Sequence, residues 1–85
     1  MAKQLILTRH AQIRAESRAI RSEWIEDAAR HPDWVELEPR DSRVERRFRV
    51  IEGFGSRILR VVCVETQTAI RVISVMFDRD ARRKP

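Results

Sequence analysis

The chain has 85 residues, 42% of them hydrophobic and 36% charged, and its formal net charge is +5. This length predicts one domain with a thin core, and the apolar fraction excludes a disordered chain. No apolar run approaches the roughly 18 residues of a membrane span, and the N-terminal residues lack the apolar length of a secretory signal. We therefore expect one cytoplasmic domain over residues 1–85, with no membrane contact.

The cations are segregated along the sequence. All of them are arginines except Lys3 and Lys84. Five cations and one anion give residues 1–22 a charge of +4, two cations and seven anions give residues 23–41 a charge of −5, and eleven cations and five anions give residues 42–85 a charge of +6. Because a guanidinium fits phosphate or carboxylate with two donors, this distribution favours recognition of a polyanion.

Two short helices are predicted after an N-terminal strand at residues 3–7. Thr8 is placed to cap the first helix, over residues 9–18, which would approach its support through the small side chains of Ala11 and Ala15. The second helix is predicted to begin with Ser22 as its N-cap and to end at Pro32. Its buried stripe has the spacing of an amphipathic helix and comprises Trp24, Ile25, Ala28 and Ala29.

The hydrophobic period then changes to two, which predicts strands at residues 34–38, 43–51, 57–65 and 69–77, with the glycines of "EGFGS" in a turn. The last two strands are apolar at nearly every position, so we expect them to be covered on both faces. Residues 78–85 are expected to be a flexible tail, too polar to pack. The predicted fold is α+β: a short N-terminal strand, then two helices on one face of a twisted antiparallel sheet of three to four strands.

The first helix carries a stripe of potential functional residues, His10, Arg14 and Arg18, at intervals of four. In a functional interpretation they form a ridge that holds a phosphate, and His10 transfers protons. In a structural interpretation Arg14 pairs with carboxylates such as Glu16, and His10 makes a structural hydrogen bond. A lone histidine is more often structural than catalytic.

Arginines also occur within the strands. Arg47 and Arg49 are predicted on one outward row, whereas Arg60 and Arg71 have apolar neighbours. Placing a guanidinium in an apolar strand costs free energy unless an anion pairs with it. Two alternatives are open for that anion, an internal carboxylate or a ligand phosphate. The candidate internal partners are Glu45, Glu65 and Asp78.

The remaining reactive side chains form no familiar pattern. His10, His31 and Cys63 lack the spacing of metal ligands, and no cofactor motif is present, so neither a metal nor a cofactor is expected. As the only cysteine, Cys63 cannot form a disulfide within the chain, which fits a reducing compartment. Phe54, at the tip of a predicted turn, is the aromatic residue expected to be exposed, where a nucleobase could stack on it.

The stretches "RHAQIRAESRAI", "HPD" and "VISVMFDRDARR" resemble an uncharacterised family of small bacterial and phage proteins that is grouped with the RelE-like plasmid toxins, among them the RelE and BrnT ribonucleases. Ala15 and Ala19 stand where methionine and glycine are commoner in that family. The resemblance implies two helices on an antiparallel sheet with a basic cleft, and metal-independent RNA cleavage. The matching residues are His10, Ala11, Arg14, Arg18 and Ile20 in the opening motif and Phe77, Asp78 and Arg79 in the closing one.

Three hypotheses follow. The first is a toxin-like endoribonuclease in which His10, or alternatively Glu45 or Glu52, carries the proton. The second is a non-catalytic module that binds RNA, on or off the ribosome, or an acidic antitoxin-like protein. The third is a homodimer in which residues 23–41 neutralise the arginines of the other copy, instead of a monomer. The phosphate ligands predicted for the ribonuclease are Arg14, Arg18, Arg47, Arg60, Arg71 and Arg79.

Overall fold

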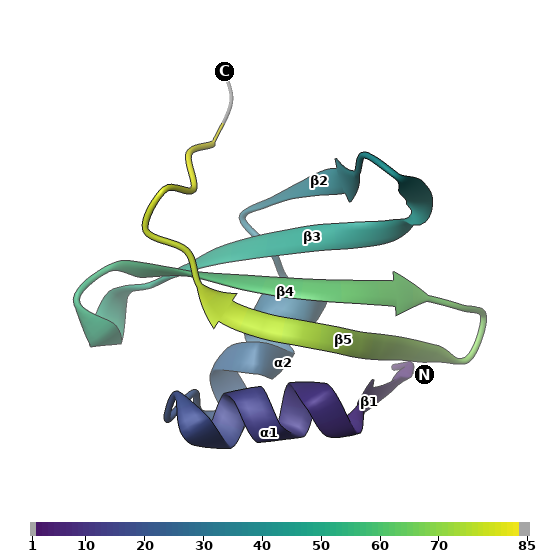
Figure 1. The fold of residues 1–85 in the computed structure, drawn as a ribbon, viewed down its shortest axis with the longest axis horizontal. Coiled ribbons are helices and arrows are strands. Elements are labelled where there is room, and N and C mark those ends of the chain that lie inside the picture. The colour runs from purple at the N-terminus through teal and green to yellow at the C-terminus, as the bar shows by residue number, and fades with distance from the viewer. Residues whose placement is uncertain (1, 84–85) are drawn as a thin grey trace.

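Five strands form one mixed sheet that carries both helices on the same face (Figure 1). The computed structural model describes residues 2–83. The strand order is β1-β5-β4-β3-β2, and β1 pairs in parallel with β5 while the other neighbours are antiparallel. The elements are β1 (Gln4–Leu7), α1 (Arg9–Ser17), α2 (Ser22–Arg30), β2 (Trp34–Glu38), β3 (Asp41–Ile51), the 3₁₀ turn η1 (Glu52–Phe54), β4 (Arg57–Glu65) and β5 (Ala69–Phe77).

The α+β class with helices on one face is confirmed, but the sheet is larger than predicted. The N-terminal strand pairs Gln4 with Ala69 and Leu7 with Val72, so it extends the sheet instead of standing apart from it. This pairing makes the sheet five-stranded and mixed instead of antiparallel with three to four strands. Among the described residues, no helix is long and apolar enough to cross a membrane.

Helix α1 lies on β5 through small side chains, as predicted. Ala11 and Ala15 are buried, whereas Ile13, on the other side of the helix, is 53% exposed. The hydroxyl of Thr8 accepts a hydrogen bond from the Ala11 backbone N–H at 3.2 Å and donates one to the carbonyl of Ile73 at 3.2 Å. Thr8 thus caps the helix and ties its first turn to β5.

Helix α2 covers β3 and β4 with Ile25, Ala28 and Ala29, which are all buried. Its predicted cap is wrong by one residue. Ser22 is already helical, and the cap position is held by Arg21, whose side chain makes no capping hydrogen bond.

The hydrophobic core lies between the helices and one face of the sheet, and the opposite face is largely open. On the open face Val62 and Val64 of β4 are only half-buried, so the prediction that β4 and β5 are covered on both faces is wrong. The physical reason is that both helices pack on the same side. The side chains of these two strands that are buried against the helices are Leu59, Val61, Cys63, Ile70, Val72 and Val75.

The segment after β5 turns back onto the sheet. The Asp78 backbone N–H donates to the carbonyl of Ile58 at 2.9 Å, and Ala81 is buried. The expectation that residues 78–85 do not pack is therefore wrong for residues 78–81, because the short side chain of Ala81 fits against the sheet despite its polar neighbours. Residues 84–85 of that predicted tail lie outside the described residues.

Candidate phosphate-binding site

An open hollow of about 460 Å³ lies where the end of α1, the connection between β3 and β4, and the segment after β5 meet. These three segments lie at the same end of the molecule, on the left in Figure 1. We call this feature the arginine hollow, because its lining includes Arg18, Arg57, Arg79 and Arg82.

Each of the three segments contributes its arginines next to the start or the end of a regular element. Arg18 is the C-cap of α1. Gly55 and Ser56 have positive φ angles of 64° and 54°, which turn the chain sharply, so that β4 begins at Arg57 with its side chain at the rim. Strand β5 ends at Phe77, and the turn that follows it places Arg79 and Arg82 in the lining.

The arginines of the hollow outnumber the carboxylates of its lining. None of them forms an ion pair with a carboxylate of residues 2–83. The lining also contains Asp78, but Arg60 donates to its Oδ2 at 3.2 Å and the backbone N–H of Asp80 to its Oδ1 at 3.0 Å. The hollow therefore carries a net positive charge suited to an anion.

Residues 7–77 match a family of domains of unknown function, DUF4258. The chain belongs to the DUF4258 family. No curated protein and no solved structure matches the chain. The family match gives no link to the RelE or BrnT ribonucleases. The matched region of this DUF4258 domain includes Arg18 and Arg57, whereas Arg79 and Arg82 follow it.

Only part of the stripe predicted on α1 of this DUF4258 domain, which comprises His10, Arg14 and Arg18, reaches the hollow. Arg18 lines the hollow, together with Arg79 from the predicted set. Arg14 and His10 are exposed on α1 and do not line it. His10 lies in the first turn of the helix, eight residues before Arg18, which corresponds to about 12 Å along the helix axis.

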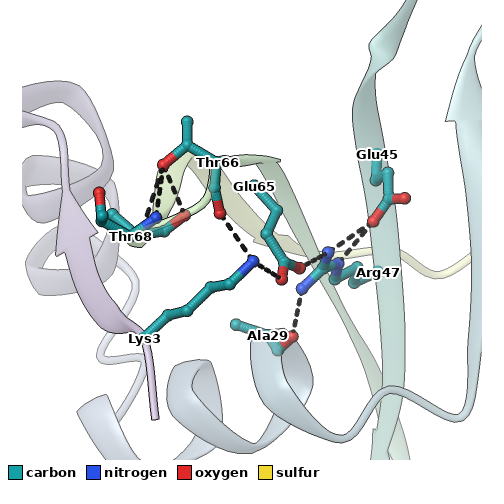
Figure 2. A network of polar contacts seen from close by, with 8 residues as sticks. Lys3, Ala29, Glu45, Arg47, Glu65, Thr66 and Thr68 are labelled. Carbon is teal, nitrogen blue, oxygen red and sulfur yellow. Dashed lines mark hydrogen bonds and ion pairs between the residues drawn. The ribbon is translucent and has the colours of Figure 1, made fainter. Parts of the chain in front are cut away.

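Arg47 occupies the helix-covered face of the sheet and is fully engaged within the protein (Figure 2). Its Nη1 donates to the Ala29 carbonyl at 2.6 Å, its Nε to Glu45 at 2.8 Å and its Nη2 to Glu65 at 2.6 Å. The prediction that Arg47 lies on an outward row is wrong, because the carbonyl and the two carboxylates satisfy its charge beneath α2. Lys3 adds a fifth residue to this network by donating to Glu65 at 2.6 Å.

Cys63, which pairs with Glu45 across the sheet, is buried beside this network. Burial raises the pKa of Cys63 to about 11, so this thiol is uncharged near neutral pH. Hydrogen bonds from Lys3 and then from Arg47 lower the pKa of Glu65 to about 2, so this carboxylate stays ionised. Both pKa shifts indicate that this network stabilises the fold.

The two remaining strand arginines lie on the open face and are not part of the hollow lining. The internal alternative applies to Arg60, which donates to Asp78 and to the sulfur of Met76 at 2.6 Å. Arg71 is exposed, beside Ile6 in β1 and Val64 in β4. Neither arginine lines the hollow.

The sequence-based prediction missed Arg57, Arg82 and Ser56. The clearest signal for Arg57 was its position directly after the glycine turn, where a strand begins at the surface. Arg82 lies in a segment predicted to be a free tail, so only the return of that segment to the sheet brings it into the site. Among residues 2–83, no group of three His, Cys, Asp or Glu side chains is arranged to hold a metal ion.

Proposed function

We propose that this domain binds RNA, with the arginine hollow holding the phosphates. The observation that carries the proposal is the convergence of four arginines from three distant segments, none paired with a carboxylate of residues 2–83. Holding like charges together costs free energy, which a bound polyanion offsets.

The chemistry of the lining fits phosphodiesters. Guanidinium forks donate two parallel hydrogen bonds to phosphate oxygens, and the exposed Ser56 beside Arg57 adds a hydroxyl donor. Four contacts to a single strand would give a slope of about −3 in a plot of log affinity against log salt concentration.

The geometry favours binding over cleavage. Cleavage through the ribose 2′-hydroxyl requires a base and an acid, and a guanidinium keeps its proton near neutral pH. The first predicted proton carrier, His10, lies about 12 Å along the helix from Arg18, and the two alternatives, Glu45 and Glu52, do not line the hollow. The ribonuclease activity implied by the RelE-like resemblance therefore stays a prediction, and the non-catalytic RNA-binding module is the function proposed here.

The test is the affinity for a fluorescein-labelled 12-nucleotide single-stranded RNA, measured by anisotropy at several salt concentrations. Arg18→Ala and Arg82→Ala should each lower the affinity and reduce the salt slope by about one contact, near 0.7. Arg71→Ala is the matched control, since it removes an exposed arginine outside the hollow lining.

Equal losses in all three variants would contradict the proposal, because binding would then depend on overall charge. Displacement of the RNA by polyglutamate of the same charge, at the same concentration as unlabelled RNA, would instead indicate an acidic protein as partner.

A further inference from the structure

A cluster of three aromatic rings adjoins the arginine hollow. Trp24 of α2 lies 5.1 Å from Phe54 of η1 and 6.2 Å from Phe77 at the end of β5, measured between ring centroids. Phe54 and Phe77 lie 5.4 Å apart. We call Trp24, Phe54 and Phe77 the aromatic cluster. Phe77 belongs to the cluster and also lines the hollow, so the two features are continuous.

The guanidinium of Arg57 lies over the aromatic cluster. Its central carbon is 5.0 Å from the ring centroid of Phe54 and 5.6 Å from that of Phe77, so it makes cation–π contacts with both rings. Arg57 is exposed and is one of the four arginines of the hollow. One side chain therefore faces both the aromatic rings and the anion site.

The outer part of the cluster is open to solvent. Trp24 and Phe77 pack against the core, but Phe54 is 39% exposed. Its neighbours Gly53 and Gly55 have open space where a Cβ would stand, with no atom within 4 Å apart from those of their own chain neighbours. The two residues beside Phe54 therefore place no side chain in the path of a planar ligand that approaches its exposed part.

We propose that Phe54 and Arg57 form a nucleobase subsite, in which an unpaired base stacks on the exposed aromatic and guanidinium surface while its phosphate enters the hollow. This inference rests on the proposed function and narrows its substrate class to single-stranded nucleic acid. Bases stack readily on aromatic rings and on arginine planes, whereas a base inside a duplex already has neighbours on both faces.

The decisive experiment compares ligands that share a phosphate chain but differ in bases. Wild-type protein is titrated with a 12-nucleotide single-stranded RNA, an abasic oligonucleotide of the same length, the corresponding RNA duplex and inorganic polyphosphate. We expect the single strand to bind about tenfold more tightly than the abasic chain or polyphosphate. Equal affinity for the single strand and the abasic chain, or for the single strand and the duplex, would overturn the subsite.

Two variants test whether Phe54 and Arg57 cause the preference for RNA over polyphosphate. Phe54→Ala should reduce the ratio of RNA affinity to polyphosphate affinity about tenfold. Arg57→Lys, which keeps the charge but loses the planar surface, should reduce the same ratio in the same direction. Ile13→Ala is the control, because it truncates an exposed apolar side chain on the outer side of α1. An unchanged ratio in both Phe54→Ala and Arg57→Lys would contradict the proposal.

A spectroscopic readout does not depend on a variant of the subsite. In a Trp34→Phe background the remaining indole is Trp24, next to Phe54. Single-stranded RNA should change its emission, and polyphosphate should not. An identical response to both ligands would contradict the base contact. Failure of the proposed function looks different: wild-type protein would then bind neither RNA nor polyphosphate, or Arg18→Ala would leave both affinities unchanged.

Discussion

Arg60 Nη1 donates to Asp78 Oδ2 at 3.2 Å and so anchors the segment that carries Arg79 and Arg82 to the open face of the sheet. We therefore expect Arg60 to position this segment and not to bind the anion itself. The phosphate-binding role suggested for Arg60 by the sequence stays a prediction.

The anchoring role predicts an effect opposite to that of simple charge removal. Asp78→Ala deletes a carboxylate from the lining, which by electrostatics alone would strengthen phosphate binding. We expect RNA affinity to fall about fivefold instead, because two arginines must then be ordered on binding. Anisotropy titrations measure this, and Asp80→Ala is the control because it removes a neighbouring exposed carboxylate whose side chain makes no hydrogen bond within residues 2–83. A gain in affinity with Asp78→Ala would disprove the anchor.

Replacing Arg47 should affect stability and leave binding alone. Arg47→Met would leave the Glu45 and Glu65 carboxylates and the Ala29 carbonyl without their shared donor, at a cost of about 3 kcal/mol in the free energy of unfolding. Urea denaturation measures this loss. RNA affinity of the folded fraction should match that of the wild type, and a selective loss of affinity would restore the phosphate role predicted from the sequence.

The Glu65 carboxylate makes the free energy of unfolding depend on pH. Because hydrogen bonds from Lys3 and Arg47 lower its folded pKa from 4.5 to about 2, its contribution is fully present above pH 4.5 and is lost as the pH falls towards 2. Glu65→Gln should therefore destabilise the protein by about 1 kcal/mol at pH 7 and by much less near pH 2. Urea denaturation of both proteins across this pH range tests the prediction, and parallel curves would refute it.

Replacing His10 distinguishes RNA binding from the predicted RNA cleavage. Its position at the exposed start of α1 leads us to expect that His10→Ala changes RNA affinity by no more than about twofold. Incubating labelled RNA with wild-type and variant protein in a chelator, followed by gel electrophoresis, tests cleavage at the same time. RNA fragments that appear with the wild type and disappear with His10→Ala would support the ribonuclease hypothesis and place its reaction on α1.

Local signals predicted the elements well. The cap at Thr8, the small face of α1 at Ala11 and Ala15, and the bounds of β4 and β5 all depend on residues close together in the sequence. Their agreement with the structure reflects strong local preferences.

Signals that depend on three-dimensional neighbours failed. The alternating pattern of β3 predicts Arg47 on an outward row. In the structure the charged stripe with Arg47 faces α2, because the Ala29 carbonyl and Glu65, which come from other elements, supply its partners. The arginine hollow could not be predicted for the same reason. Arg57 and Arg82 come together only when β4 and the segment after β5 have folded.

The parallel pairing of β1 with β5 has a consequence for biosynthesis. The first strand finds its partner in Ala69 to Val72, and Ala11 has no sheet to rest on until β5 exists. A nascent chain leaving the ribosome therefore cannot complete this core until β5 has emerged. Closure between such remote segments is slow, so the final sheet forms after translation of β5 and not progressively during elongation.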